Sequence, residues 1–164
     1  MTSVTKRKFS LAELLVYVAF VFLLISLSVQ SLHSAQKDAR VSLVKADLLE
    51  LKKLALIAQT QSGLDLHQIT GQSCSACVCQ DDNLNSSNCV VNQSNAFRNL
   101  SNASEGLVHL NSSLLSDPWG APYLINERQY DTCLYSLLFS AGPDKKISTN
   151  DDNLAFKVEG RNCN

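Results

Sequence analysis

The hydrophobic residues of this chain are concentrated near its amino end. Between Phe9 and Leu32, 18 of 24 residues are hydrophobic, and Glu13 is the one charged residue among them. The stretch Phe9–Val29 has 21 residues, which as an α-helix span about 31 Å, the thickness of the hydrocarbon core of a bilayer. The apolar core of a cleaved signal peptide is shorter than this. The pattern therefore predicts a membrane-spanning helix over residues 9–32.

The hydrophobic positions after the membrane segment are spaced by three and four residues, as on one face of an α-helix. No Gly or Pro interrupts the pattern before Gly63, where a helix is expected to stop. We therefore expect one helix from Phe9 to about Gln61, apolar on all sides over residues 9–32 and amphipathic over residues 33–62. A short coiled coil is the alternative interpretation. The apolar stripe consists of Val41, Val44, Leu48, Leu51, Ala55 and Ala58. The polar residues expected to lie off it are Asp38, Lys45, Glu50, Lys52, Lys53 and Gln59.

The rest of the chain falls into two regions of different composition. Residues 63–116 are dominated by Asn and Ser, which favour turns, and we expect one short helix there, within Leu107–Leu115. Residues 117–164 are expected to form three antiparallel strands, which need an amphipathic helix to complete their core. The sequence thus predicts an α+β fold: a long amino-terminal helical spine with a small antiparallel sheet packed on its carboxy-terminal half. The three runs typical of strands are Tyr123–Ile125, Thr132–Phe139 and Leu154–Val158.

Charge and composition exclude several classes of protein. Fourteen Lys and Arg against fifteen Asp and Glu give a net charge of −1, which leaves no basic excess for an extended nucleic-acid surface. With 45% hydrophobic residues, the chain can bury a core and is not disordered throughout. The sequence contains no Gly-rich phosphate loop and no recognisable pair of nucleophile and base, so we do not expect an enzyme. The basic residues of segment 1–8 place it in the cytoplasm and the body across the membrane.

Six cysteines lie in the part that we expect to be translocated. An even number in such a location indicates disulfides that staple a loop-rich domain. Fifteen pairings are possible, and one hypothesis fastens the carboxy-terminal tail to the sheet through Cys133 and Cys163 while the other four lock the Asn- and Ser-rich region. Zinc binding by four clustered thiols and redox activity at the C-x-x-C spacing are the alternatives. The cysteines are Cys74, Cys77, Cys79, Cys89, Cys133 and Cys163.

The amino end resembles that of type IV pilins and of the pseudopilins of type II secretion systems. The resemblance rests on Lys6-Arg7-Lys8 followed by Phe9-Ser10-Leu11-Ala12-Glu13-Leu14-Leu15-Val16. In that family a prepilin peptidase cuts a basic leader directly before a Phe, and a Glu is fifth in the mature chain. The resemblance implies cleavage between Lys8 and Phe9, and neutralisation of the new α-amine by Glu13 of a neighbouring subunit during assembly. The family normally has a Gly where Lys8 stands.

Two later segments are similar to the major pseudopilins. The first, Asp117-Pro118-Trp119-Gly120-Ala121-Pro122-Tyr123, resembles the turn through which their chain enters the sheet, and we assign it a structural role. The second, Ser140-Ala141-Gly142-Pro143-Asp144 with Asp151-Asp152, is similar to their calcium loop. Because Ca²⁺ prefers oxygen ligands, the resemblance implies a calcium site at Asp144, Asp151 and Asp152. The family has a Gly where Lys145 stands, and an acidic surface turn is the alternative interpretation.

The resemblance implies a structural subunit of a pseudopilus that serves type II protein secretion across the outer membrane. Its expected partners are further copies of itself, other pilin-like subunits, the prepilin peptidase, the inner-membrane assembly platform and membrane lipid, but not nucleic acid. We expect the protein in a bacterial inner membrane, with its body in the periplasm and its amino end in the cytoplasm. A surface pilus is one alternative. An uncleaved, membrane-tethered binding module is another, and Lys8 favours it.

Overall fold

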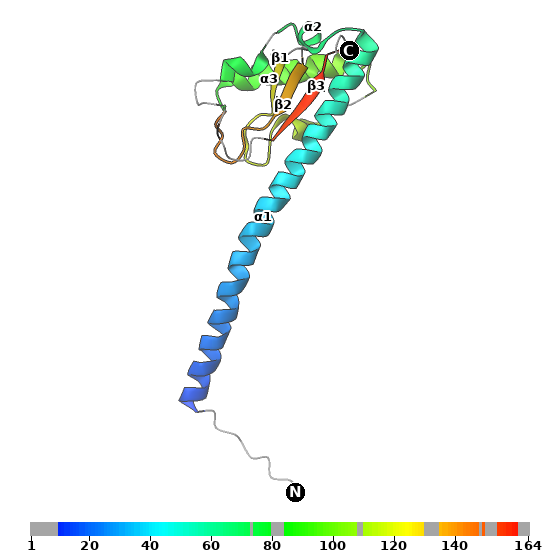
Figure 1. Cartoon of the computed structure of the whole chain (residues 1–164). Coiled ribbons are helices and arrows are strands. Elements are labelled where there is room, and N and C mark those ends of the chain that lie inside the picture. Colours follow the sequence, from blue (N-terminus) through cyan, green and yellow to red (C-terminus); the bar gives the residue numbers. More distant parts are fainter. Residues whose placement is uncertain are drawn as a thin grey trace. The chain divides into compact units, whose positions relative to one another are not determined.

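Figure 1 shows the computed structural model of the chain. It describes residues 10–72, 74–79, 84–107, 110–129, 135–147, 149 and 154–160, although the side chains of residues 27–33, 128 and 129 lie outside the description. The chain divides into two compact units, Met1–Ala39 and Arg40–Asn164. Helix α1 (Leu11–Ser62) has 52 residues and contributes to both units. The single continuous helix that the apolar spacing predicts is therefore present.

In the first unit, α1 carries its apolar side chains on the surface. Every described large apolar side chain from Leu11 to Ile25 is exposed, with exposed fractions of up to 79%. Within the part of the chain that the structure describes, no helix has both the length and the apolarity that crossing a membrane requires.

In the second unit, one face of α1 enters the core. The predicted stripe is correct for the five residues from Val44 to Ala58, which are fully buried, while Val41 is half-buried. Leu54 joins the buried face. The expectation that Gln59 lies off the stripe is wrong: it is only 4% exposed, and its Nε2 donates to the backbone oxygen of Glu159 at 3.5 Å. Its amide can be buried because it reaches a backbone acceptor on a neighbouring strand.

The sheet has three antiparallel strands in the order β1-β2-β3, which confirms the predicted α+β class. They are β1 (Leu124–Gln129), β2 (Tyr135–Phe139) and β3 (Ala155–Glu159). Leu124 of β1 pairs with Phe139 of β2, and Leu138 pairs with Phe156 of β3. The register shifts between Asn126 and Gln129. Figure 1 shows the three strands beside the second half of α1.

The two faces of the sheet contribute to different hydrophobic clusters. Ile125, Leu138 and Val158 belong to the larger cluster, together with the buried face of α1. Leu124 belongs to a smaller cluster, and Phe139 packs against it. Neighbouring residues of a strand point to opposite faces of the sheet. For this reason Leu124 and Ile125, which are adjacent in β1, belong to different clusters. The smaller cluster comprises Ala76, Cys79, Leu84, Cys89, Ala121, Leu124 and Ala141.

The region expected to form turns contains a helix that composition did not predict. Helix α3 (Ser87–Ala103) has 17 residues, and the side chain of its N-cap Ser86 accepts a hydrogen bond from the backbone N–H of Cys89. Its buried residues recur at helical spacing, so that the Asn residues lie mostly on the outer face. Tertiary packing of this narrow stripe outweighs the weak helix propensity of Asn and Ser. The buried residues are Cys89, Gln93, Ala96, Phe97 and Leu100.

Short helices complete the same region. They are α2 (Leu66–Thr70) and the 3₁₀ helices η1 (Ser75–Cys79) and η2 (Ser112–Leu115). Asp65 and Gln68 form a capping box at the start of α2. The short helix expected within 107–115 is thus present in reduced form, as the single 3₁₀ turn η2.

Helix α3 also meets the unpaired edge of the sheet. Because β1 is the first strand in the order, one of its edges has no neighbouring strand among the described residues. The backbone N–H of Ile125 donates to Oε1 of Gln93 at 3.0 Å, and Gln93 is only 1% exposed. An unpaired strand edge can pair with the strands of other chains. At this edge of β1, the side chain of Gln93 from α3 accepts the hydrogen bond that another strand would otherwise accept.

Replacing Phe97 with Ala is expected to lower the free energy of unfolding by about 3–5 kcal/mol, because the side chain is fully buried and leaves a cavity. Val91→Ala, at an exposed position of the same helix, is the matched control and is expected to stay within about 0.5 kcal/mol of the parent. Urea unfolding followed by the fluorescence of Trp119, the single Trp of the chain, measures both. Equal, small effects would contradict the packing of α3 into the core.

Candidate functional site

Glu13 lies in the first turn of α1 and is exposed. Its Oε2 accepts a hydrogen bond from the backbone N–H of Ser10 at 3.2 Å. This is the contact by which a Glu at the third helical position caps a helix, and a negative charge at this end also interacts favourably with the helix dipole. Glu13 therefore has a local structural role, besides any role in assembly. Lys8 and Phe9, the residues of the expected cleavage site, lie outside the described residues.

The turn at Asp117 is held by a set of hydrogen bonds to one buried carboxylate. Oδ1 of Asp117 accepts from the backbone N–H groups of Trp119 at 3.1 Å and Ala121 at 2.9 Å. Oδ2 accepts from the hydroxyl of Ser140 at 2.7 Å. Gly120 has φ +80°, a conformation that glycine adopts without strain. The motif thus joins the entry to β1 to the exit from β2, which fits the structural role that its sequence predicts.

The loop after β2 contains the first residue of the expected calcium site. Asp144 is exposed, and its Oδ1 accepts from the backbone N–H of Lys146 at 2.9 Å. Lys145 has φ +56°, so this position keeps the left-handed conformation that a Gly would adopt more easily. Among the described residues no group of three His, Cys, Asp or Glu side chains could hold a metal ion. Asp151 and Asp152 lie outside the described residues, so the calcium site remains a prediction.

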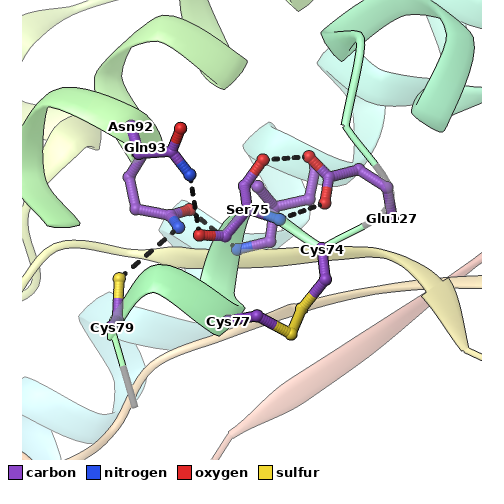
Figure 2. Close-up of a disulfide and its surroundings, with 8 residues drawn as sticks. Cys74, Ser75, Cys77, Cys79, Asn92, Gln93 and Glu127 are labelled. Carbon is purple, nitrogen blue, oxygen red and sulfur yellow. Dashed lines mark hydrogen bonds between the residues drawn. A yellow bond between two sulfur atoms is a disulfide. The ribbon is translucent and has the colours of Figure 1, made fainter. Parts of the chain in front are cut away.

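Four of the six cysteines form two disulfides, Cys74–Cys77 and Cys79–Cys89. The first, shown in Figure 2, links Cys74, the residue before η1, to Cys77 within η1. The second ties the end of η1 to the first turn of α3. All four sulfurs are bonded in pairs, so none is a thiolate ligand for zinc in this structure. The expected pairing of Cys133 with Cys163 lies outside the described residues.

Beside these disulfides lies a buried carboxylate that the sequence did not single out. Glu127 of β1 is only 3% exposed. It accepts hydrogen bonds from both the backbone N–H and the hydroxyl of Ser75, as Figure 2 shows. Burial raises the pKa of Glu127 above its usual value, and the hydrogen bonds from Ser75 oppose that shift. The carboxylate is thus held by the first residue of η1, inside the segment that Cys74–Cys77 closes.

Asn92 of α3 fixes the same segment from the other side. Its Nδ2 donates to the backbone oxygen of Ser75 at 2.9 Å, and its Oδ1 accepts from Nε2 of Gln72 at 2.8 Å. The polar chain Gln72–Asn92–Ser75–Glu127 therefore connects α3, η1 and β1. These four residues are common polar types, and their positions in the sequence match no known motif. Only the three-dimensional structure therefore reveals this series of hydrogen bonds.

A second buried contact links α1 to the start of the sheet. The hydroxyl of Tyr123 donates to Oδ2 of Asp47 at 2.7 Å, and Tyr123 is fully buried. Burial raises the pKa of this phenol, and the hydrogen bond to Asp47 raises it further. Asp47 is separated from Tyr123 by 76 positions, so no local pattern in the sequence predicts this contact.

Comparisons of the chain with family models, with curated proteins and with solved structures found no match.

Replacing Glu127 with Gln is expected to flatten the dependence of stability on pH. A carboxyl whose pKa is raised on folding does not oppose folding below its ordinary pKa, here 4.5, and costs stability as the pH rises through its folded value. As the pH rises from the ordinary pKa of Glu127 through its folded pKa, the parent should therefore lose stability relative to Glu127→Gln. Urea unfolding from about pH 4 to pH 8 measures this dependence. Glu159→Gln, at an exposed position of β3, is the control, and parallel curves for Glu127→Gln and the parent would contradict the assignment.

Proposed function

We propose that the chain is a structural subunit of a pseudopilus or type IV pilus-like filament that serves type II protein secretion. The observation that carries the proposal is the first part of α1, from Leu11 to Ile25, where apolar side chains lie exposed and the single carboxylate is that of Glu13. An exposed apolar surface of this extent marks contact with lipid or protein. Lipid before assembly, and the helices of other subunits after it, would both cover this surface.

The membrane-embedded state belongs to the same proposal. It rests on the apolar run Phe9–Val29, which extends at both ends beyond residues 10–26, whose side chains the structure describes. A carboxylate in such a segment is costly unless it has a partner. In a filament, the α-amine of the neighbouring subunit, freed by cleavage before Phe9, would supply the opposite charge. Glu13 would then register one subunit against the next.

The body provides further support for helix-to-helix assembly. Leu43, Leu49 and Leu56 of α1 are between 41% and 52% exposed. At 100° per residue Leu49 and Leu56 lie on the side of the helix away from the buried face, whereas Leu43 lies at the edge of that face, beside Leu54. Helix α1 therefore has one apolar face for the core of the body and a second apolar surface that neighbouring subunits could cover.

The turn at Asp117 and the loop at Ser140 favour secretion over a surface pilus, because both resemble segments of major pseudopilins. Neither segment suggests catalysis, so the proposed role is structural. The partners proposed with it are other pilin-like subunits, the prepilin peptidase and the assembly platform of a bacterial inner membrane.

Replacing Glu13 with Gln is expected to reduce incorporation into filaments at least tenfold while leaving the body folded, because the charge that pairs with the α-amine is lost. Gln retains an acceptor oxygen for the N–H of Ser10, as a capping box requires, so this variant separates charge from capping. Counting subunits in sheared filaments by immunoblot measures incorporation. Glu50→Gln, at another exposed carboxylate of α1, is the control. Normal incorporation of Glu13→Gln would overturn the proposed mechanism of assembly.

The alternative, an uncleaved and membrane-tethered binding module, is favoured by Lys8, because a peptidase of this family normally meets Gly there. Sequencing the amino terminus of the protein from membranes distinguishes the two functions. A chain that begins at Phe9 is expected from the proposal, since only cleavage frees the amine that Glu13 would neutralise. A chain that retains the leader 1–8 would contradict the filament subunit and support the membrane-tethered binding module.

A further inference from the structure

A hollow of about 350 Å³ lies between α3 and η2 and has no part in the proposed assembly. Ser94, Arg98 and Ser101 line it from α3, where their spacing of four and three residues places them on one face of the helix. Ser112 of η2 adds a third hydroxyl. The size lies within the range of small-molecule sites.

Two leucine side chains form the apolar part of the same hollow. Leu110 and Leu115 both line it, both are half-buried, and both pack against the larger hydrophobic cluster. They are therefore supported from behind by the core. The lining residues that the structure describes thus combine two leucine side chains, three hydroxyls and the guanidinium of Arg98.

The guanidinium of Arg98 is the chemically distinctive group of the hollow. It is exposed and has no hydrogen-bond or ion-pair partner among the residues that the structure describes. Between Leu84 and Ser116 the sequence contains one other charged residue, Glu105. Arg98 is therefore the one Lys or Arg of this stretch of the sequence. An Arg presents a planar fork of N–H donors that matches a carboxylate in two parallel hydrogen bonds.

We propose that this hollow, between α3 and η2, binds a small sugar acid. The carboxylate would pair with Arg98, the sugar hydroxyls would bond with Ser94 and Ser112, and the C–H face of the ring would lie against Leu115. A simple inorganic anion would use the guanidinium and hydroxyls but not the apolar wall. A neutral sugar would use the hydroxyls and the wall but leave the guanidinium unpaired. The combination of all three features favours the sugar acid.

An NMR titration of the isotope-labelled full chain in detergent micelles tests the site, with glucuronate, glucose and inorganic phosphate as probes. We expect glucuronate to shift the amide signals of Ser94, Arg98 and Ser101 at lower concentration than the other two probes. Arg98→Gln is expected to weaken glucuronate binding by about tenfold or more, because a charge-assisted pair is lost. Arg40→Gln, at an exposed arginine of α1, is the matched control and should bind as the parent does.

Each other outcome of the titration decides against the proposal. Equal shifts with phosphate would make the hollow a general anion site, and equal shifts with glucose would remove the role of Arg98. No shifts at millimolar glucuronate, or shifts that persist in a folded Arg98→Gln variant, would also overturn it. The titration requires no filament, so its result is independent of whether the chain assembles.

Discussion

A sheet of three strands cannot bury its own faces, and the structure depends on how two helical segments cover them. On one face the stripe of α1 from Val44 to Ala58 packs against Ile125, Leu138 and Val158. On the other face, Leu124 packs with residues of η1 and α3. Among the buried residues of the larger cluster, α1 contributes more than any other element, and full burial of one Val or Leu side chain contributes about 1.5–3 kcal/mol. The body therefore cannot be separated from the second half of α1 without losing its core.

The long helix and the sheet could be predicted because their hydrophobic spacing is regular. The stripe of α1 repeats at three and four residues over five turns, and β3 is a short run that fits one strand. Composition does not predict helix α3, because Asn and Ser favour turns, although Cys89, Ala96, Phe97 and Leu100 recur at helical spacing. The spacing of the last three was visible in the sequence. Gln93, by contrast, gave no signal, because a buried amide is explained only by the strand edge that it satisfies.

The candidate sites show the same division between local and long-range information. Asp117 accepts from the backbone N–H groups of Trp119 and Ala121 within five positions, so a local motif predicts the turn, although its third hydrogen bond comes from Ser140. Glu127 and Ser75 are separated by 52 positions, and the segment that brings them together is closed by the Cys74–Cys77 disulfide. No spacing in one sequence encodes such a contact. The cysteine count predicts disulfides that staple a loop, and in the structure the Cys74–Cys77 disulfide also closes the segment whose Ser75 donates to the buried carboxylate of Glu127.

In the loop after β2, hydrogen bonds hold the backbone in place, which is the role that the resemblance assigns to a calcium ion. Ser140 donates its hydroxyl to Asp117 and accepts from the backbone N–H of Gly142 at 3.1 Å, so the start of the loop is tied to the turn before β1. Further along, Oδ1 of Asp144 is engaged by the N–H of Lys146. A calcium ion that used Asp144 would bind through Oδ2 or share Oδ1 with that donor. The described part of the loop is therefore ordered by its own residues, and an ion would add to this order without having to create it.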